Sequence, residues 1–155
     1  MRTGFAERGG WWVVAQVVAF TVVAVVYLQD PRTLVSPVPA VAGLAVVAAG
    51  AVLAGDGVWR LRATITPYPA PLEGARLVDA GSYGLVRHPI YGGGVLMVVG
   101  MSVAVGSWPT GAAGAGLGVF FLVKSSWEER LLAEAVAGYE RYCSKVRKRL
   151  IPFVI

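Results

Sequence analysis

The sequence predicts an all-α protein: an integral membrane bundle of about four transmembrane helices with an amphipathic cytosolic helix near its C-terminus. Of its 155 residues, 56% are hydrophobic and only 15% are charged, whereas soluble domains carry about 25% charged residues. The apolar residues form four runs nearly free of charge, at residues 11–28, 38–54, 89–106 and 109–123. Because a membrane-spanning helix needs roughly 20 such residues, we expect residues 1–155 to form one membrane domain.

The first and last of these runs need separate justification. The first follows Arg2 and Arg8 as a signal peptide would, but it is longer than a typical signal core and no small-residue cleavage site follows Leu28. We interpret it as a retained anchor. The fourth run has 15 residues, which at ~1.5 Å per residue cover about 22 Å of a hydrocarbon core of roughly 30 Å. It therefore extends through Trp127 or spans incompletely.

The positive charges gather on the side that we expect to face the cytoplasm. The chain has 14 basic residues and a net charge of +5. With the N-terminus inside, only Arg32 falls on the outer side. The cytoplasmic group comprises Arg2, Arg8, Arg60, Arg62, Arg76, Arg87 and seven more residues from Lys124 to Arg149. This pattern predicts cytoplasmic termini and explains the basicity without a nucleic-acid partner. The high alanine, valine and glycine content suggests a bacterial plasma membrane.

Neither a disulfide nor a metal site is expected. Cys143 is the only cysteine and His88 the only histidine. A disulfide needs two cysteines, and zinc sites need a cluster of such ligands.

Polar side chains divide the chain into two parts. In the interior of the first run only Gln16 and Thr21 have side chains that form hydrogen bonds, so residues 1–62 are predicted to be scaffold helices. The connection over residues 56–87 is long and polar, and three prolines at alternate positions within residues 67–71 exclude regular helix. Long irregular segments usually carry function.

A first polar cluster stands directly before the third run. Arg87 and His88 precede Pro89, which suits a first helical turn because it has no amide hydrogen to leave unpaired. The free amides of Ile90 and Tyr91, together with the helix dipole, favour a negative charge beyond the helix end. These groups form a candidate site for an anion such as a carboxylate. Alternatively, Arg87 and His88 only anchor the helix at the lipid headgroups.

A second polar cluster, Lys124 with Glu128 and Glu129, follows the fourth run. If helix continues there, Lys124 and Glu128 share one face, either as a plain ion pair or toward a polar cavity, since adjacent carboxylates at a membrane exit are costly. A short connection joins the third and fourth runs into an antiparallel hairpin, in which Gly114 and Gly118 permit close packing. The hairpin brings both polar clusters to one cytoplasmic rim.

The chain beyond residue 123 turns amphipathic. Apolar side chains recur there at near-helical spacing, at Trp127, Leu131, Ala135, Tyr139 and Val146. We expect one helix against the bundle at the membrane surface, with the basic residues 145–149 as an anchor to anionic lipid.

An ordered set of motifs over residues 64–153 resembles the isoprenylcysteine carboxyl methyltransferase family and its phospholipid N-methyltransferase relatives. The matching positions are Leu77, Val78, Gly81, Tyr83, Arg87, His88, Pro89, Tyr91, Gly93, Glu128, Glu129, Tyr139, Tyr142, Val146, Ile151 and Pro152. The resemblance implies that residues 63–155 form the core that binds S-adenosylmethionine in a pocket facing the cytoplasm.

The resemblance also assigns roles to individual positions. The implied cofactor-binding residues are Arg76, Leu77, Val78, Tyr83, His88, Pro89, Tyr91 and Glu128, and the candidate catalytic residues are Lys124, Arg87 and Glu129. Lys124 stands where the family has a basic residue near the substrate carboxylate. An arginine is usual there in eukaryotic members, and a lysine offers a point charge instead of a two-pronged fork.

The expected reaction is methylation of a lipophilic carboxylate at the cytoplasmic membrane face, on a small-molecule or prenylated substrate surrounded by membrane lipid. Three alternatives stay open. A phospholipid or amine N-methyltransferase would need a carboxylate near its substrate, and Glu129 could serve. Some membrane sterol reductases that use NADPH share a similar segment around Arg87. A non-catalytic membrane scaffold would tolerate changes at Arg87, His88 and Glu128.

Overall fold

In the computed structural model, residues 4–30, 36–62, 66–71 and 74–154 are described. Their regular structure is helical throughout, which confirms the all-α prediction. The elements are α1 (Gly10–Gln29), α2 (Pro37–Leu61), the 3-10 helix η1 (Gly81–Gly84), α3 (Pro89–Val105), α4 (Trp108–Ala135) and α5 (Tyr139–Lys145). Residues 66–71 of the proline-rich connection are not helical, as predicted. Arg2, Arg32, Thr64 and Ile65 lie outside the described residues.

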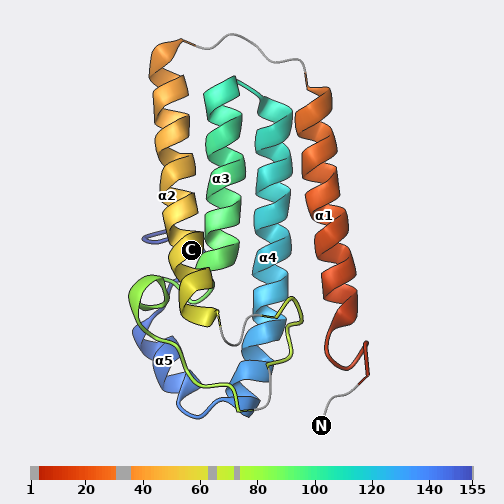
Figure 1. Ribbon diagram of the computed structural model, residues 1–155, viewed down its shortest axis with the longest axis vertical. Helices are drawn as coiled ribbons and strands as arrows, with labels where there is room; N and C mark the ends of the chain where they lie inside the picture. The colour runs from red at the N-terminus through yellow and green to blue at the C-terminus, as the bar shows by residue number, and fades with distance from the viewer. Residues whose placement is uncertain (1–3, 31–35, 63–65, 72–73, 155) are drawn as a thin grey trace.

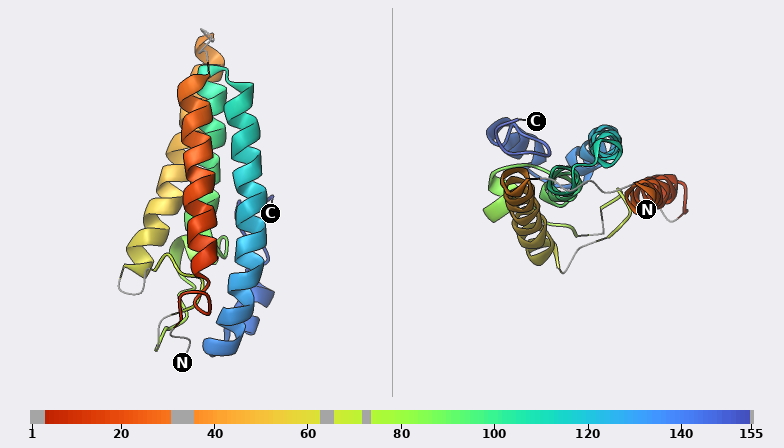
Figure 2. Two further views of the ribbon diagram at one scale, coloured as in Figure 1. Left: turned by 90° about the vertical axis from the view of Figure 1, so that its right-hand side faces the viewer. Right: turned by 90° about the horizontal axis from the view of Figure 1, so that it is seen from above.

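The four long helices lie side by side in the spatial order α2, α3, α4, α1 (Figure 1). The α3–α4 hairpin is present as predicted, and α1 packs against α4. The connection before α3, the 3-10 helix and α5 gather at the end of the bundle where α1 begins (Figures 1 and 2). This crowded end holds both predicted polar clusters, Arg87 with His88 and Lys124 with Glu128 and Glu129.

Glycines bring α2 and α3 into the closest contact of the bundle. A Cβ atom on Gly43 would lie 2.5 Å from the carbonyl oxygen of Gly100, and one on Gly93 would lie 2.4 Å from that of Gly50. No larger residue fits such spacing without separating the helices. Gly114 of α4 makes a looser contact, 3.0 Å from Val98. The predicted contact at Gly114 is therefore present, but the tighter glycine contacts between α2 and α3 were not predicted.

Two helices are long and apolar enough to cross a membrane, α1 with 20 residues and α2 with 25. Their most apolar stretches are almost wholly unburied within the protein, 0% and 17% respectively, so these faces need an apolar solvent. The third apolar helix, α3, has 17 residues, slightly short of the roughly 20 that span a bilayer. Of the four expected transmembrane helices, α1 and α2 thus have the length and apolar composition needed to cross a membrane.

The C-terminal helix differs from the prediction. Instead of one amphipathic helix over residues 127–146, α4 continues to Ala135, and only α5 is separate. The helix ends because Val136 is extended, and Gly138 then adopts a left-handed conformation at φ 82°, which favours glycine.

Residues 146–150, which we call the C-terminal segment, return to the start of α3. The amides of Arg87 and His88 donate to the carbonyls of Lys148 and Arg149 at 2.9 and 2.8 Å. Leu150 is buried in the core formed with Val95, Leu117 and Phe121. The segment fits because Gly92 has no side chain: a Cβ atom there would lie 1.7 Å from the Leu150 carbonyl oxygen.

Candidate functional site

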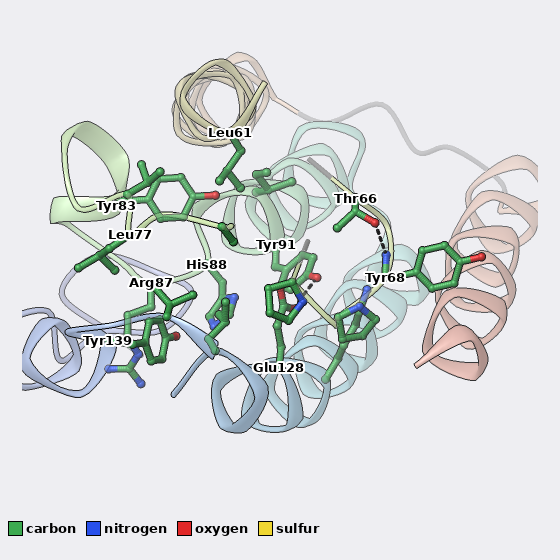
Figure 3. A pocket seen from close by; sticks show the side chains of 18 of the residues that line it. Leu61, Thr66, Tyr68, Leu77, Tyr83, Arg87, His88, Tyr91, Glu128 and Tyr139 are labelled. Atoms are coloured by element: carbon green, nitrogen blue, oxygen red, sulfur yellow. Dashed lines mark hydrogen bonds between the residues drawn. The ribbon is translucent and has the colours of Figure 1, made fainter. Parts of the chain in front are cut away.

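A cavity of about 430 Å³ opens at the crowded end of the bundle, between the connection, the start of α3 and the second half of α4 (Figure 3). Its volume lies within the roughly 300–1,000 Å³ of typical ligand sites. All but two of the predicted site residues line it: Arg76, Leu77, Val78, Tyr83, Arg87, His88, Tyr91, Lys124 and Glu128. The cavity is therefore built at the rim where the two polar clusters were expected to meet.

Pro89 and Glu129, also predicted for the site, are not among the lining residues. Pro89 starts α3 and is buried against α2, where a Cβ atom on Gly57 would lie 3.0 Å from its ring. Glu129 lies behind the cavity wall, where its carboxylate meets the side chains of Arg87, His88 and Arg149.

The Glu129 carboxylate joins the start of α3 to the C-terminal segment. Arg87 Nε lies 2.7 Å from Oε1, His88 Nε2 lies 3.1 Å from Oε1, and Arg149 Nη2 lies 3.2 Å from Oε2. Arg87 Nη1 also donates to the carbonyls of Val146 and Arg147, at 2.8 and 3.1 Å. Each of these bonds crosses between elements that are distant in sequence.

Hydrogen bonds and opposite charges hold Glu129 together with Arg87, His88 and Arg149, and we call these four side chains the clamp. Burial alone would raise the pKa of Glu129, but the hydrogen bonds from His88 and Arg87 lower it to about 2. Burial alone would lower the pKa of Arg87, yet its bond with Glu129 raises it overall. Both groups therefore stay ionised at neutral pH, with their charges directed mainly at each other.

An aromatic stack forms the cavity wall on α3. The rings of His88 and Tyr91 are parallel to within 4°, with centroids 5.6 Å apart, and Tyr91 stacks on Phe121 at 4.4 Å. The Tyr91 hydroxyl donates to Glu128 Oε2 at 2.9 Å, and Figure 3 shows these side chains converging on the cavity. Glu128 therefore faces the cavity, whereas its neighbour Glu129 does not.

Lys124 is buried in the same wall, with a relative exposure of 1%. It shares the face of α4 with Glu128, as predicted, but the plain ion pair between them is not formed. Among the described residues, the ammonium donates to the side-chain oxygen of Gln16 and makes no ion pair. Its Nζ atom lies 5.0 Å from the centre of the Tyr91 ring. The Lys124 ammonium therefore faces the cavity without a direct ion pair, and the Glu128 carboxylate acts on it from one helical turn away.

Sequence reasoning missed several lining residues. Gln16 and Leu61 come from residues 1–62, which were expected to be scaffold, and Tyr139 and Tyr142 were matched to a motif without a role. Gln16 carried a usable signal, because polar side chains within apolar helices are expensive and commonly functional. The division into scaffold and core stays a prediction, with Gln16 and Leu61 as contributors from the first part.

The two tyrosines of α5 differ in how their hydroxyls are bonded. Tyr142 donates to the Tyr83 carbonyl at 2.7 Å and so fixes η1 against α5. The Tyr139 hydroxyl is buried beside the Cys143 thiol, without an oxygen or nitrogen partner among the described residues. Burial raises the pKa of Tyr139, so it stays a donor at neutral pH.

The helical bundle, its exposed apolar faces and the cavity at one end fit a membrane protein with a ligand site at that end. The family model for phospholipid methyltransferase matches residues 38–137, more than half of the chain. The protein therefore belongs to the phospholipid methyltransferase family, and it is a membrane methyltransferase that acts on lipid-related substrates. A search of curated proteins found no match to the chain.

This family implies S-adenosylmethionine as the methyl donor, and the cavity can be tested against that cofactor. The volume is adequate, and Glu128 offers carboxylate oxygens for the cofactor's amino or hydroxyl groups. Tyr139 offers a buried hydroxyl, and apolar side chains such as Leu77 and Leu132 can cover a flat base. The residues present fit the cofactor. Across the described chain, no group of three metal-ligating side chains accompanies them.

Proposed function

We propose that the protein transfers a methyl group from S-adenosylmethionine to the carboxylate of a lipophilic substrate, as the isoprenylcysteine carboxyl methyltransferases do. One observation carries this proposal. The buried Lys124 ammonium faces the cavity without an ion pair among the described residues, one helical turn before Glu128. A buried positive charge is costly unless something opposite in charge meets it, and a substrate carboxylate would do so.

In this proposal the cofactor occupies the half of the cavity nearest α5. Arg76, Leu77, Val78 and Tyr83 would hold it from the connection and η1, His88 and Tyr91 from α3, and Glu128 from α4. When bound, S-adenosylmethionine supplies a methyl group made electrophilic by its positively charged sulfur. Pro89 and Glu129 lie outside the cavity lining and would fix the positions of His88 and Arg87.

The chemistry suits a site without a strong base. A carboxylate oxygen forms the new O–CH₃ bond with its lone pair, while the C–S bond breaks and its electrons return to sulfur. No proton has to leave, so the protein's main tasks are to align the two reactants and exclude water. Lys124 would orient the carboxylate, and burial in the cavity wall would keep that geometry fixed.

The proposal places α3 and α4 in the membrane beside α1 and α2. Both termini would then be cytoplasmic, in agreement with the distribution of basic residues, and we propose a bacterial plasma membrane. The cavity would open at the cytoplasmic face while the substrate's apolar tail, of a small molecule or a prenylated group, stays among the lipids. This arrangement explains why a methyltransferase of this kind is built from apolar helices.

A phospholipid amine is the second candidate substrate, because the matched family is described as phospholipid methyltransferase. An amine must lose a proton, which calls for a carboxylate near the reacting nitrogen. Glu129 is unsuited to that task, because its carboxylate is engaged by two arginines and His88 and does not line the cavity. Glu128 would have to serve, with Lys124 repelling an ammonium substrate nearby.

Cofactor binding is tested by isothermal titration of the purified protein in lipid nanodiscs with S-adenosylhomocysteine. We expect saturable binding that is lost in His88→Ala and Glu128→Ala and kept in Gln29→Ala, a change at the far end of α1. No binding by folded wild-type protein would overturn the proposal.

Product chemistry separates the two candidates. The protein is incubated with methyl-labelled S-adenosylmethionine in nanodiscs that carry a bacterial lipid extract, and the labelled lipid is then treated with base. A methyl ester releases its label as methanol, whereas an N-methyl group keeps it. We expect base-labile product, and base-stable product alone would establish amine methylation.

A further inference from the structure

We infer that Gln16 and Lys124 together select the charge of the substrate headgroup, so that the cavity accepts a lipophilic carboxylate and rejects a lipophilic amine. This inference rests on the proposed function and adds a specificity residue to it. Gln16 belongs to α1, outside the residues 38–137 that match the family. The matched region therefore does not supply this part of the cavity wall.

Aromatic contacts on both sides fix the position of Gln16. Trp12, Gln16 and Phe20 are spaced by four residues and so lie on one face of α1. The Trp12 ring packs on Phe120 and the Phe20 ring on Phe121, each with centroids 6.0 Å apart. Gln16 is held between these two contacts with α4, and its side chain lines the cavity.

The bond between Gln16 and Lys124 leaves the charge of the ammonium intact. The Lys124 ammonium donates to the side-chain oxygen of Gln16, and an amide is a neutral acceptor. An ammonium has three donors, so others remain for a ligand in the cavity. A carboxylate at position 16 would instead form an ion pair with Lys124 and cancel the charge that the cavity presents.

The Gln16 amide also supplies a second donor group. When its oxygen accepts from Lys124, its NH₂ group remains available on the same carboxamide. The ammonium and the amide then offer one donor to each oxygen of a substrate carboxylate. Two residues from different helices thus provide the two-pronged recognition that a single arginine fork gives elsewhere.

The depth of Gln16 and Lys124 in the bundle suits a lipid headgroup. Gln16 is six residues beyond the first residue of α1, which at 1.5 Å per residue places it about 9 Å along the helix. An amphiphile whose carboxylate reaches this level keeps its tail among the apolar faces of the bundle. The same level would bring a protonated amine against Lys124.

Binding of two matched amphiphiles tests the inference without the cofactor. Palmitate and hexadecylamine have the same tail length and opposite charges, and each is titrated into the full chain in phosphatidylcholine nanodiscs. Wild-type protein should bind palmitate and not hexadecylamine. Gln16→Glu should weaken palmitate binding about tenfold or more, the effect of losing a charged hydrogen bond, and should gain hexadecylamine binding.

Gln29→Glu is the matched control, because it makes the same change on the exposed last residue of α1. Gln16→Leu removes the second donor but keeps the charge, so it should weaken palmitate binding without admitting hexadecylamine. Lys124→Gln keeps a hydrogen-bond donor but removes the charge, so it should lose palmitate binding because no ammonium remains to attract the carboxylate. Retained S-adenosylhomocysteine binding shows that each variant is folded.

The outcomes separate this inference from the proposed function. If wild-type protein binds palmitate and Gln16→Glu behaves like Gln29→Glu, the role of Gln16 is overturned and the proposed function stands. If wild-type protein prefers hexadecylamine, both fail. If Gln16→Glu exchanges palmitate for hexadecylamine and still binds S-adenosylhomocysteine, Gln16 is a specificity residue.

Discussion

Glu129 and Lys124 lie five residues apart on α4, but the Glu129 charge is paired within the protein whereas the Lys124 charge has no direct ion pair among the described residues. The Glu129 carboxylate meets Arg87, His88 and Arg149 and lies outside the cavity. Among the described residues, the Lys124 ammonium donates its hydrogen bond to a neutral group, the Gln16 amide oxygen, and it faces the cavity. A charge whose partners are all within the protein stabilises the fold, whereas a charge left without an ion pair is available to a ligand. The clamp therefore fixes Arg87 and His88 at the start of α3, and under the proposed function Lys124 binds the substrate carboxylate.

The strongest test of the clamp is Glu129→Gln. This change leaves two arginine guanidinium groups and the His88 ring without their carboxylate, and removing one partner of a buried pair costs about 3 kcal/mol or more. We expect the free energy of unfolding to fall by about that amount in SDS titrations of the protein in mixed micelles. Glu140→Gln, at an exposed carboxylate of α5, is the control. Equal stability of the two variants would contradict the clamp.

The converse test is Lys124→Met, which keeps an unbranched side chain one atom shorter and removes the charge. We expect kcat/KM for a lipophilic carboxylate to fall by about 100-fold, because a buried charged contact with the substrate is lost. Binding of S-adenosylhomocysteine, followed by titration, should stay close to wild type. Equal losses of both would place Lys124 in the cofactor half instead.

A third test separates shape from charge in the docking of the C-terminal segment. Gly92→Ala places a methyl group against the Leu150 carbonyl oxygen, and such overpacking costs typically about 1–3 kcal/mol. We expect lower thermal stability and weaker S-adenosylhomocysteine binding, since the segment also bonds to Arg87 and His88. Gly94→Ala is the control on the same helix, where a Cβ atom would meet nothing within 4 Å. Similar effects from both changes would refute the close fit.

The smallest effect should be a loss of stability at acid pH. The pKa of Glu129 is lowered to about 2 in the folded protein, below roughly 4.3 for an unfolded glutamate. A lowered folded-state pKa means that the contribution of Glu129 is complete above about pH 4.3 and is lost as the pH falls toward 2. Unfolding midpoints measured from pH 6 to 3 should drop in wild type and drop less in Glu129→Gln. Parallel curves would exclude Glu129 as the titrating group.

The helical class and the rim that carries both polar clusters follow from local features of the sequence. Apolar runs become helices because a chain in lipid must satisfy its own backbone hydrogen bonds, and a short connection forces the third and fourth runs into a hairpin. Spacing by four residues places Lys124 and Glu128 on one face wherever helix continues. These are local constraints, so they could be read from the chain together with the family resemblance.

Which of these side chains reach the cavity depends on how distant segments pack together. Successive residues of a helix point about 100° apart, so the rotation of α4 in the bundle sends Glu128 to the cavity and Glu129 to the clamp. The approach of Gln16 to Lys124 depends on how α1 packs against α4, 108 residues further along the chain. The return of residues 146–150 to the start of α3 depends on the space left at Gly92. Such contacts arise from packing between distant segments, which no local pattern in the sequence specifies.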